Sequence, residues 1–124
     1  METRAEEIPT VWLVNEGGHD YSDLARFGNV IPVTTGSVNP FNPGRLLVAI
    51  QHRLQLAKET DYVAISGLQI LNGLVMVFWL MRFERIQLLQ WSTRQSRYEC
   101  KDITRDQIER MVNGEQASWD NTSP

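Results

Sequence analysis

The sequence predicts an α/β domain with a mainly parallel sheet and an antiparallel hairpin at its C-terminal edge. Short apolar runs typical of strands alternate with longer segments that have helical spacing of apolar residues. The last two strand-like runs are separated only by the polar turn STRQS, which favours a hairpin. Alternating strands and helices of these lengths form parallel sheets. The 124 residues suffice for one domain with its own core but are too few for a full dinucleotide-binding fold.

The first third of the chain predicts two strands. Residues 1–10 are polar and acidic, which indicates a flexible N-terminus. The run VWLV at 11–14 is typical of a strand covered on both faces. A short helix capped by Asp20 or Ser22 is expected to end near Gly28. The second strand, 29–34, contains Pro32 and is therefore expected at an edge of the sheet.

The rest of the chain continues the alternation. An amphipathic helix is expected at 44–58, with Pro43 at its start, and a helix apolar nearly all round at 68–83. Strands are expected at 62–65, 86–91 and 97–103, and a last helix with a Thr104–Gln107 capping box runs to 112. These elements describe one compact three-layer Rossmann-like domain at 11–112, followed by a disordered tail at 113–124 in which Trp119 could dock.

Charge and cysteine usage narrow the function classes. The formal net charge of −3 argues against general nucleic-acid binding, which needs a basic face. The single cysteine and the lack of an apolar leader indicate a reducing compartment, and the cytoplasm is therefore the expected location. Residues 62–81 carry no charge and match a membrane span in length. Their internal Ser-Gly, Gln and Asn-Gly divide them more naturally into a strand and a helix, so no membrane association is expected.

Loops that follow the first three strands carry the candidate ligand site. Ligands of parallel sheets bind beyond the carboxyl ends of the strands, and Gly-containing turns leave backbone N–H groups free for anions. The predicted ligand-binding residues are Asn15, Gly17, Gly18, His19, Asp20, Thr35, Gly36, Ser37, Arg45, Ser66, Gly67 and Asn72. The alternative is that Gly, Ser and Thr serve only the geometry of these turns. Neither GxGxxG nor a Walker pattern is present, so no cofactor is identified.

The sequence supports a catalytic site or a metal site less well than a ligand-binding site. His19 and Asp20 could act as a base or hold a metal, but His52 is the only other histidine and no ligand set is complete, so no metal is expected. Ser66 follows a strand as a nucleophile elbow would, without the GxSxG pattern, and a role as N-cap of the next helix is favoured. The sequence therefore favours a protein that is not an enzyme, without deciding the matter.

The helix at 68–83 leaves almost no polar face. One side is expected to pack on the sheet, and the other needs a cover because monomers rarely expose large apolar patches. A homodimer interface is the favoured cover, and the interface candidates are Leu74, Val75, Phe78 and Trp79. The competing covers are the C-terminal helix and Trp119.

The stretches VWLVNEGGHDYSDLARFG and DYVAISGLQILNGLVMVFWLMRFERIQLLQW resemble small uncharacterised Rossmann-like proteins encoded by tailed phages and prophages. The resemblance covers about residues 11–103. It implies a viral or mobile-element origin and no assigned chemistry. It singles out Asn15, His19, Asp20, Ser66 and Asn72 as site candidates along one edge of the sheet.

Together these observations favour a small non-enzymatic phage-type accessory or regulatory protein. It would bind a host or viral protein partner, or a small anionic ligand, at the carboxyl edge of the strands. The alternative is a nucleotide- or phosphate-binding enzyme or sensor that uses the same cleft, with His19 as acid or base. A protein anchored in a membrane through residues 62–81 is a third class.

Overall fold

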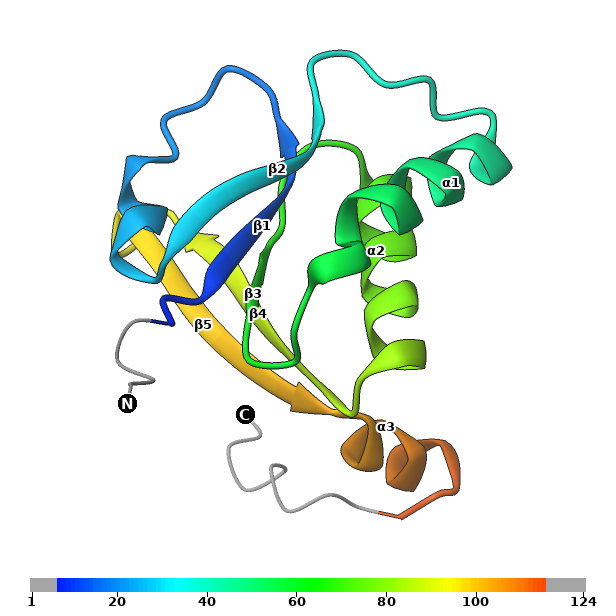
Figure 1. Cartoon of the computed structure of the whole chain (residues 1–124). Helices are drawn as coiled ribbons and strands as arrows, with labels where there is room; N and C mark the ends of the chain where they lie inside the picture. Colours follow the sequence, from blue (N-terminus) through cyan, green and yellow to red (C-terminus); the bar gives the residue numbers. More distant parts are fainter. Residues whose placement is uncertain (1–6, 116–124) are drawn as a thin grey trace.

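A single five-stranded sheet forms the centre of the computed structural model, which describes residues 7–115 (Figure 1). Its order is β2-β1-β3-β4-β5, where the strands are β1 (Thr10–Glu16), β2 (Asn29–Thr35), β3 (Tyr62–Ala64), β4 (Arg85–Ser92) and β5 (Arg97–Thr104). The first four are parallel, and β5 runs antiparallel to β4. The predicted α/β class, the C-terminal hairpin and the edge position of Pro32 in β2 are confirmed.

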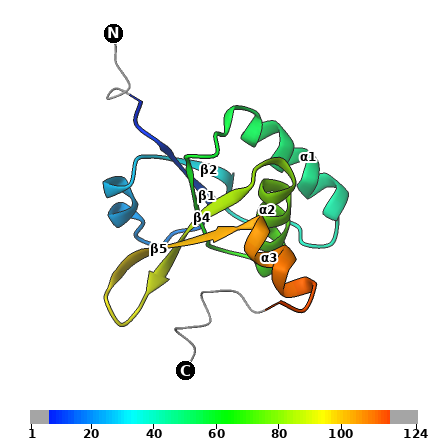
Figure 2. The ribbon, with the colours of Figure 1, turned by 90° about the horizontal axis from the view of Figure 1, so that it is seen from below.

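The two faces of the sheet are covered unequally (Figure 2). Helices α1 (Pro43–Arg53) and α2 (Gln69–Arg82) lie on one face, and the short 3₁₀ helix η2 (Ser22–Arg26) lies on the other. A second 3₁₀ helix, η3 (Leu54–Leu56), ends the α1 segment earlier than predicted. Arg82 of α2 donates to the carbonyl oxygens of Leu54 and Gln55 there, which supplies the partners that a continued helix would have given.

Alternate side chains of β1 divide the core between these faces. Trp12 and Val14 pack with the α1 and α2 side, whereas Val11 and Leu13 pack with Leu24 of η2. This division follows from the two-residue period of a strand and explains why the VWLV run is apolar throughout.

Two predicted interface residues belong to this core. Val75 and Trp79 are 0% exposed, and the Trp79 indole N–H donates to the Arg85 carbonyl oxygen at 3.0 Å. The prediction that they are interface side chains is wrong, because both lie on the face of α2 that packs into the core. Leu74 and Phe78 are partly exposed.

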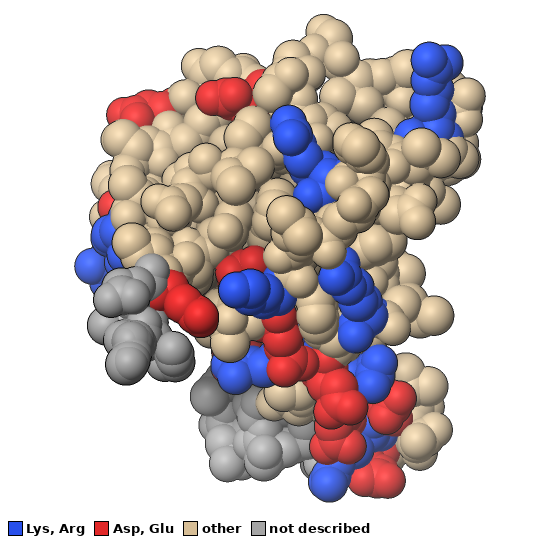
Figure 3. All heavy atoms as spheres, in the orientation of Figure 1, with Lys and Arg blue, Asp and Glu red and all other residues tan. Residues whose placement is uncertain are grey.

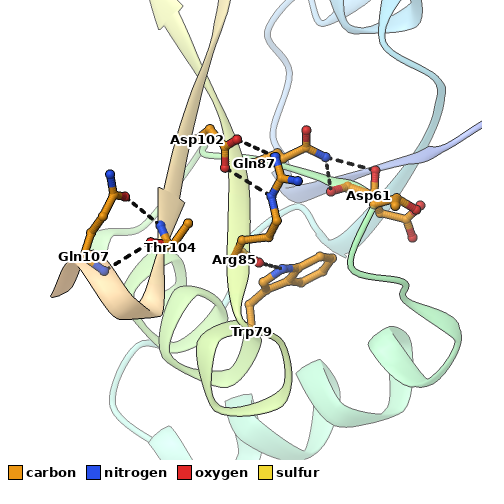
Figure 4. Close-up of polar contacts among 8 residues, drawn as sticks. Asp61, Trp79, Arg85, Gln87, Asp102, Thr104 and Gln107 are labelled. Atoms are coloured by element: carbon orange, nitrogen blue, oxygen red, sulfur yellow. Dashed lines mark hydrogen bonds and ion pairs between the residues drawn. The ribbon is translucent and has the colours of Figure 1, made fainter. Parts of the chain in front are cut away.

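The amino edge of the sheet is organised by one buried residue, Asp61, which lies beside Gln87 of β4 (Figure 4). Asp61 accepts hydrogen bonds from the Thr10 amide at 3.0 Å, the Trp12 indole at 3.1 Å and the Lys58 amide at 3.0 Å. Gln87 of β4 donates to the Asp61 carbonyl oxygen at 3.4 Å. These contacts fix where β1, β3 and β4 begin relative to one another.

The last helix, α3 (Arg105–Val112), begins with the predicted capping box. Thr104 Oγ1 accepts from the Gln107 amide at 3.1 Å, and Gln107 Oε1 accepts from the Thr104 amide at 2.9 Å (Figure 4). None of the side chains of α3 is buried. Residues 1–6 and 116–124, including Trp119 and most of the predicted tail, lie outside the described residues.

The uncharged stretch 62–81 forms β3, a turn and most of α2. Within residues 7–115, no helix has the length and apolar character that a membrane span requires.

Candidate functional site

The strand order places a topological switch point between β1 and β3. The chain leaves β1 to form β2 on one side and then crosses back to form β3 on the other. The loops that follow β1 and β3 therefore diverge, and ligands of parallel sheets bind in the crevice between such loops.

Three polar side chains, Asn15, Thr34 and Ser66, meet at this point, and their hydrogen bonds go mainly to the backbone at the end of β1. Ser66 Oγ donates to the Asn15 carbonyl oxygen at 2.6 Å and accepts from the Asn15 amide at 3.1 Å. Thr34 Oγ1 lies 2.8 Å from both the Val14 carbonyl oxygen and Asn15 Oδ1. The sequence prediction that Ser66 caps α2 is wrong, since Leu68 occupies the N-cap position and no side chain caps the helix. Ser66 instead joins β1 to the end of β3.

Asn72 holds the turn between β3 and α2. Its Oδ1 accepts from the Ser66 amide at 3.0 Å, and its Nδ2 donates to the carbonyl oxygens of Leu68 at 2.9 Å and Ser66 at 3.1 Å. The side chain is 8% exposed. Its amide is therefore used within the protein, and it supports the site rather than lining it.

Gly67 allows this turn to approach β1 closely. Its φ is +78°, which L side chains rarely adopt, and a Cβ there would lie 2.8 Å from Asn15 Cβ. The sequence thus needs glycine at this position for both backbone conformation and space.

Asn15 and the two neighbouring loops form a pocket of about 700 Å³, here called the switch-point pocket. Residues 36–38 after β2 form one wall, and residues 67–70 at the start of α2 form the other. None of the lining residues is charged. Backbone amides at the uncapped N-terminus of α2 are consequently the positively polarised groups at this wall.

The side-chain amide of Asn15 has one end without a protein partner among residues 7–115. The Thr34 hydroxyl satisfies one end, but no hydrogen bond is formed by Nδ2, which faces the Gly67 turn. Because Thr34 has a single hydroxyl proton and two acceptors, the amide can also be turned over so that its oxygen faces the turn. In both orientations an atom of this 8% exposed residue lies at the pocket wall without a partner in the described part of the chain.

A second pocket, of about 520 Å³, lies beside Ser66 and Gly67 and is here called the aromatic pocket. Its walls are residues 19–21 of the β1–η2 loop, residues 65–67 after β3, and Trp91 and Tyr98 of the hairpin. The Asp20 carboxylate accepts from the Ser22 amide at 2.9 Å, and this bond lowers the pKa of Asp20 below its usual value. The aromatic pocket therefore carries a carboxylate at neutral pH.

The predicted site residues divide between these pockets. Asn15, Gly36, Ser37 and Gly67 line the switch-point pocket, and His19, Asp20, Ser66 and Gly67 line the aromatic pocket. The other candidates, Gly17, Gly18, Thr35, Arg45 and Asn72, line neither. Arg45, a predicted ligand-binding residue, is exposed in the first turn of α1, so its positive charge lines neither pocket.

Three aromatic residues of the aromatic pocket, Tyr21, Trp91 and Tyr98, were not among the predicted site residues. Trp91 and Tyr98 are directly opposite each other in the β4–β5 pairing. Pairing the two predicted strands around the intervening turn would have brought these rings together. Across residues 7–115, no three His, Cys, Asp or Glu side chains gather closely enough to hold a metal ion.

Fold and site together define a small α/β domain with two pockets at the carboxyl edge of a mainly parallel sheet. Residues 9–104 match the model of the Phage Pam3 gp32-like protein family, and the chain belongs to that family. The match spans every strand of the sheet and both pockets. Neither the curated proteins nor the solved structures contain a significant match.

Proposed function

We propose that this chain is a small non-enzymatic phage accessory protein that binds a small anionic ligand in the switch-point pocket. The observation that supports the proposal is the buried Asn15 amide, which lacks a partner at one end within residues 7–115 and lies beside the uncapped N-terminus of α2. The site of action that we propose is the cytoplasm of the host cell.

The chemistry of the pocket wall favours an anion. The first N–H groups of a helix have no partner within the helix, and the helix dipole adds positive potential at the same place. Residues 68–70 of the wall belong to this first turn or its cap. The Asn15 amide, with its N–H₂ toward the turn, would supply one further donor. A phosphate or carboxylate would accept bonds from both.

The hydrogen bonds of the Ser66 hydroxyl argue against a role for Ser66 as a nucleophile. It donates to one backbone atom of Asn15 and accepts from another, and both contacts fix β1 against β3. His19 lies in the other pocket. The alternative, a phosphate-handling enzyme or sensor with His19 as acid or base, would require His19 to reach a ligand across the Gly67 turn.

Calorimetric titration with inorganic phosphate tests the proposal. Gln69→Glu places a carboxylate at the pocket wall in the first turn of α2, where it is compatible with the helix dipole. One like charge a few ångströms from the anion costs roughly 1–2 kcal/mol at intermediate dielectric, so phosphate binding should weaken about tenfold. The control, Gln51→Glu, makes the same charge change at an exposed position of α1 and should leave binding unchanged.

Equal weakening by both variants would show only a general charge effect and would contradict the pocket. If titration of the unmodified protein with phosphate and with acetate gives no heat of binding, the proposal of an anion site is contradicted. Phosphate binding that is lost in His19→Gln but retained in Gln69→Glu would favour the alternative with a functional histidine.

We also propose self-association through the outer face of α2. Ile70, Val77 and Met81 are 43%, 61% and 79% exposed, and their spacing places them on one side of the helix. Light scattering after size exclusion should give a dimer mass for the unmodified chain and a monomer mass for Val77→Glu. A monomer mass for both would contradict the homodimer and leave a host or viral protein as the partner to seek.

A further inference from the structure

The aromatic pocket differs from the switch-point pocket in both shape and charge. Trp91 and Tyr98 have ring centroids 5.2 Å apart at 71°, and His19 and Tyr21 have centroids 6.1 Å apart at 83°. The two rings of each pair are thus in edge contact with each other. Tyr98 is 5% exposed, whereas Trp91 is 46% exposed. Trp91 therefore supplies an accessible ring face to this pocket, which His19 and Tyr21 also line.

The charged side chain that lines this pocket is acidic, and the nearby arginines, Arg26 and Arg97, act on Asp23. Asp20 lines the pocket, and no lysine or arginine of residues 7–115 does. Acidic side chains are seen at the upper left of Figure 3, over the loop between β1 and η2, whereas the mixed patch of acidic and basic side chains lies below, over α3. Burial raises the pKa of Tyr98, and Asp23 and Asp20 contribute to that rise. A cation would thus meet favourable potential where an anion would not.

The arginine of η2, Arg26, is held by contacts within the protein. Arg26 Nε lies 3.0 Å from Asp23 Oδ1, its guanidinium stacks over the Phe27 ring at 4.2 Å, and it donates to the Tyr98 carbonyl oxygen. Arg26 therefore stabilises the contact between η2 and β5. Asp20 accepts from the Ser22 amide through Oδ1, and hydrogen bonding by the Ser22 backbone and side chain lowers the pKa of this carboxyl, so its negative charge faces the pocket.

We propose that the aromatic pocket is a binding site for an organic ammonium group. Aromatic faces attract ammonium cations through their quadrupoles, and tryptophan does so most strongly. Trp91 is 46% exposed, so its ring is accessible to a ligand. The volume of about 520 Å³ exceeds that of a trimethylammonium group and leaves space for the chain that carries it. This site is independent of the proposed anion site, since the ligand class and most lining residues differ.

Titration of the full chain with choline and with 3,3-dimethylbutan-1-ol, its uncharged analogue of the same shape, isolates the contribution of the charge. Choline should bind about tenfold more tightly than the alcohol, as measured by calorimetry. In two-dimensional NMR spectra, choline should shift the Trp91 indole signal and leave the buried Trp12 and Trp79 indoles unmoved.

Two variants separate the two contributions of the pocket. Trp91→Leu removes the aromatic face and retains apolar volume, and Asp20→Asn removes the charge but keeps an oxygen that can accept from the Ser22 amide. Each should weaken choline binding roughly 3- to 10-fold. The matched control, Asp106→Asn, removes an exposed carboxylate on α3 and should leave the affinity for choline unchanged.

Equal affinity for choline and the alcohol would overturn the proposal, because the pocket would then select only for apolar shape. Unchanged choline binding in both Trp91→Leu and Asp20→Asn would also overturn it, as would binding of adenosine with no binding of choline. A peptide that carries trimethyllysine, compared with free choline, distinguishes the source: tighter binding of the peptide indicates a protein side chain, and tighter binding of choline indicates a small molecule.

Discussion

Substitution of Gly67 by alanine is expected to destabilise the protein through two separable effects. The left-handed conformation, φ +78°, costs an L residue about 1–2 kcal/mol. The new Cβ would lie 2.8 Å from Asn15 Cβ and 2.9 Å from Asn15 Nδ2, and such overpacking costs about 1–3 kcal/mol. The expected loss in free energy of unfolding is therefore about 2–5 kcal/mol.

Gly36→Ala provides the matched control. Its φ is +67°, but no atom of the described residues lies within 4 Å of the position that its new Cβ would take, so only the conformational cost of about 1–2 kcal/mol applies. The smaller entropy of the alanine-containing unfolded chain affects both variants alike and cancels in the comparison. Urea denaturation followed by circular dichroism should show Gly67→Ala to be the less stable variant by about 1–3 kcal/mol. Equal stability of the two variants would refute the close approach of the β3–α2 turn to Asn15.

Three further changes test the supports of the site. Asn72→Ala removes the bonds that hold the turn at Ser66 and should lower the free energy of unfolding by about 2–3 kcal/mol in urea titration; a loss below about 0.5 kcal/mol would contradict that role. The hydrogen bond from the Tyr98 amide lowers the pKa of Asp23 in the folded protein, so its stabilisation is present above the usual pKa of 3.8 and is lost as the pH falls through the lower folded-state pKa. Asp23→Asn should therefore flatten the acid side of a plot of melting temperature against pH. An unaltered acid side would contradict this contribution of Asp23. Thr104→Ala breaks the capping box and should cost about 1 kcal/mol, concentrated in faster amide exchange in α3, whereas unchanged exchange there would argue against the cap.

The sequence predicted the elements well because their signals are local. The apolar run 11–14 and the alternation in 97–103 identify strands without knowledge of the fold, and Pro32 indicates an edge because it cannot donate to a neighbouring strand. The capping box of α3 was predicted for the same reason, since both of its residues lie within one turn of helix.

Roles that depend on long-range contacts were harder to predict. Ser66 resembles a helix N-cap in sequence, but its hydroxyl bonds to Asn15, a residue 51 positions away, once β1 and β3 pair. Trp79 resembles an interface residue because its helix is apolar all round, and only the docking of α2 on the sheet shows that its side is the covered one. The aromatic pocket required the register of β4 against β5, which places Trp91 opposite Tyr98.

The most direct test of the central claim is a titration of ¹⁵N-labelled protein with inorganic phosphate, followed in two-dimensional NMR spectra. The anion site predicts saturable shifts of the backbone amides of residues 67–70 and of the Asn15 side-chain NH₂ signals, while the amides of α3 stay in place. Shifts spread evenly over exposed amides, or shifts that spare residues 67–70 and Asn15, would contradict an anion site at the switch point.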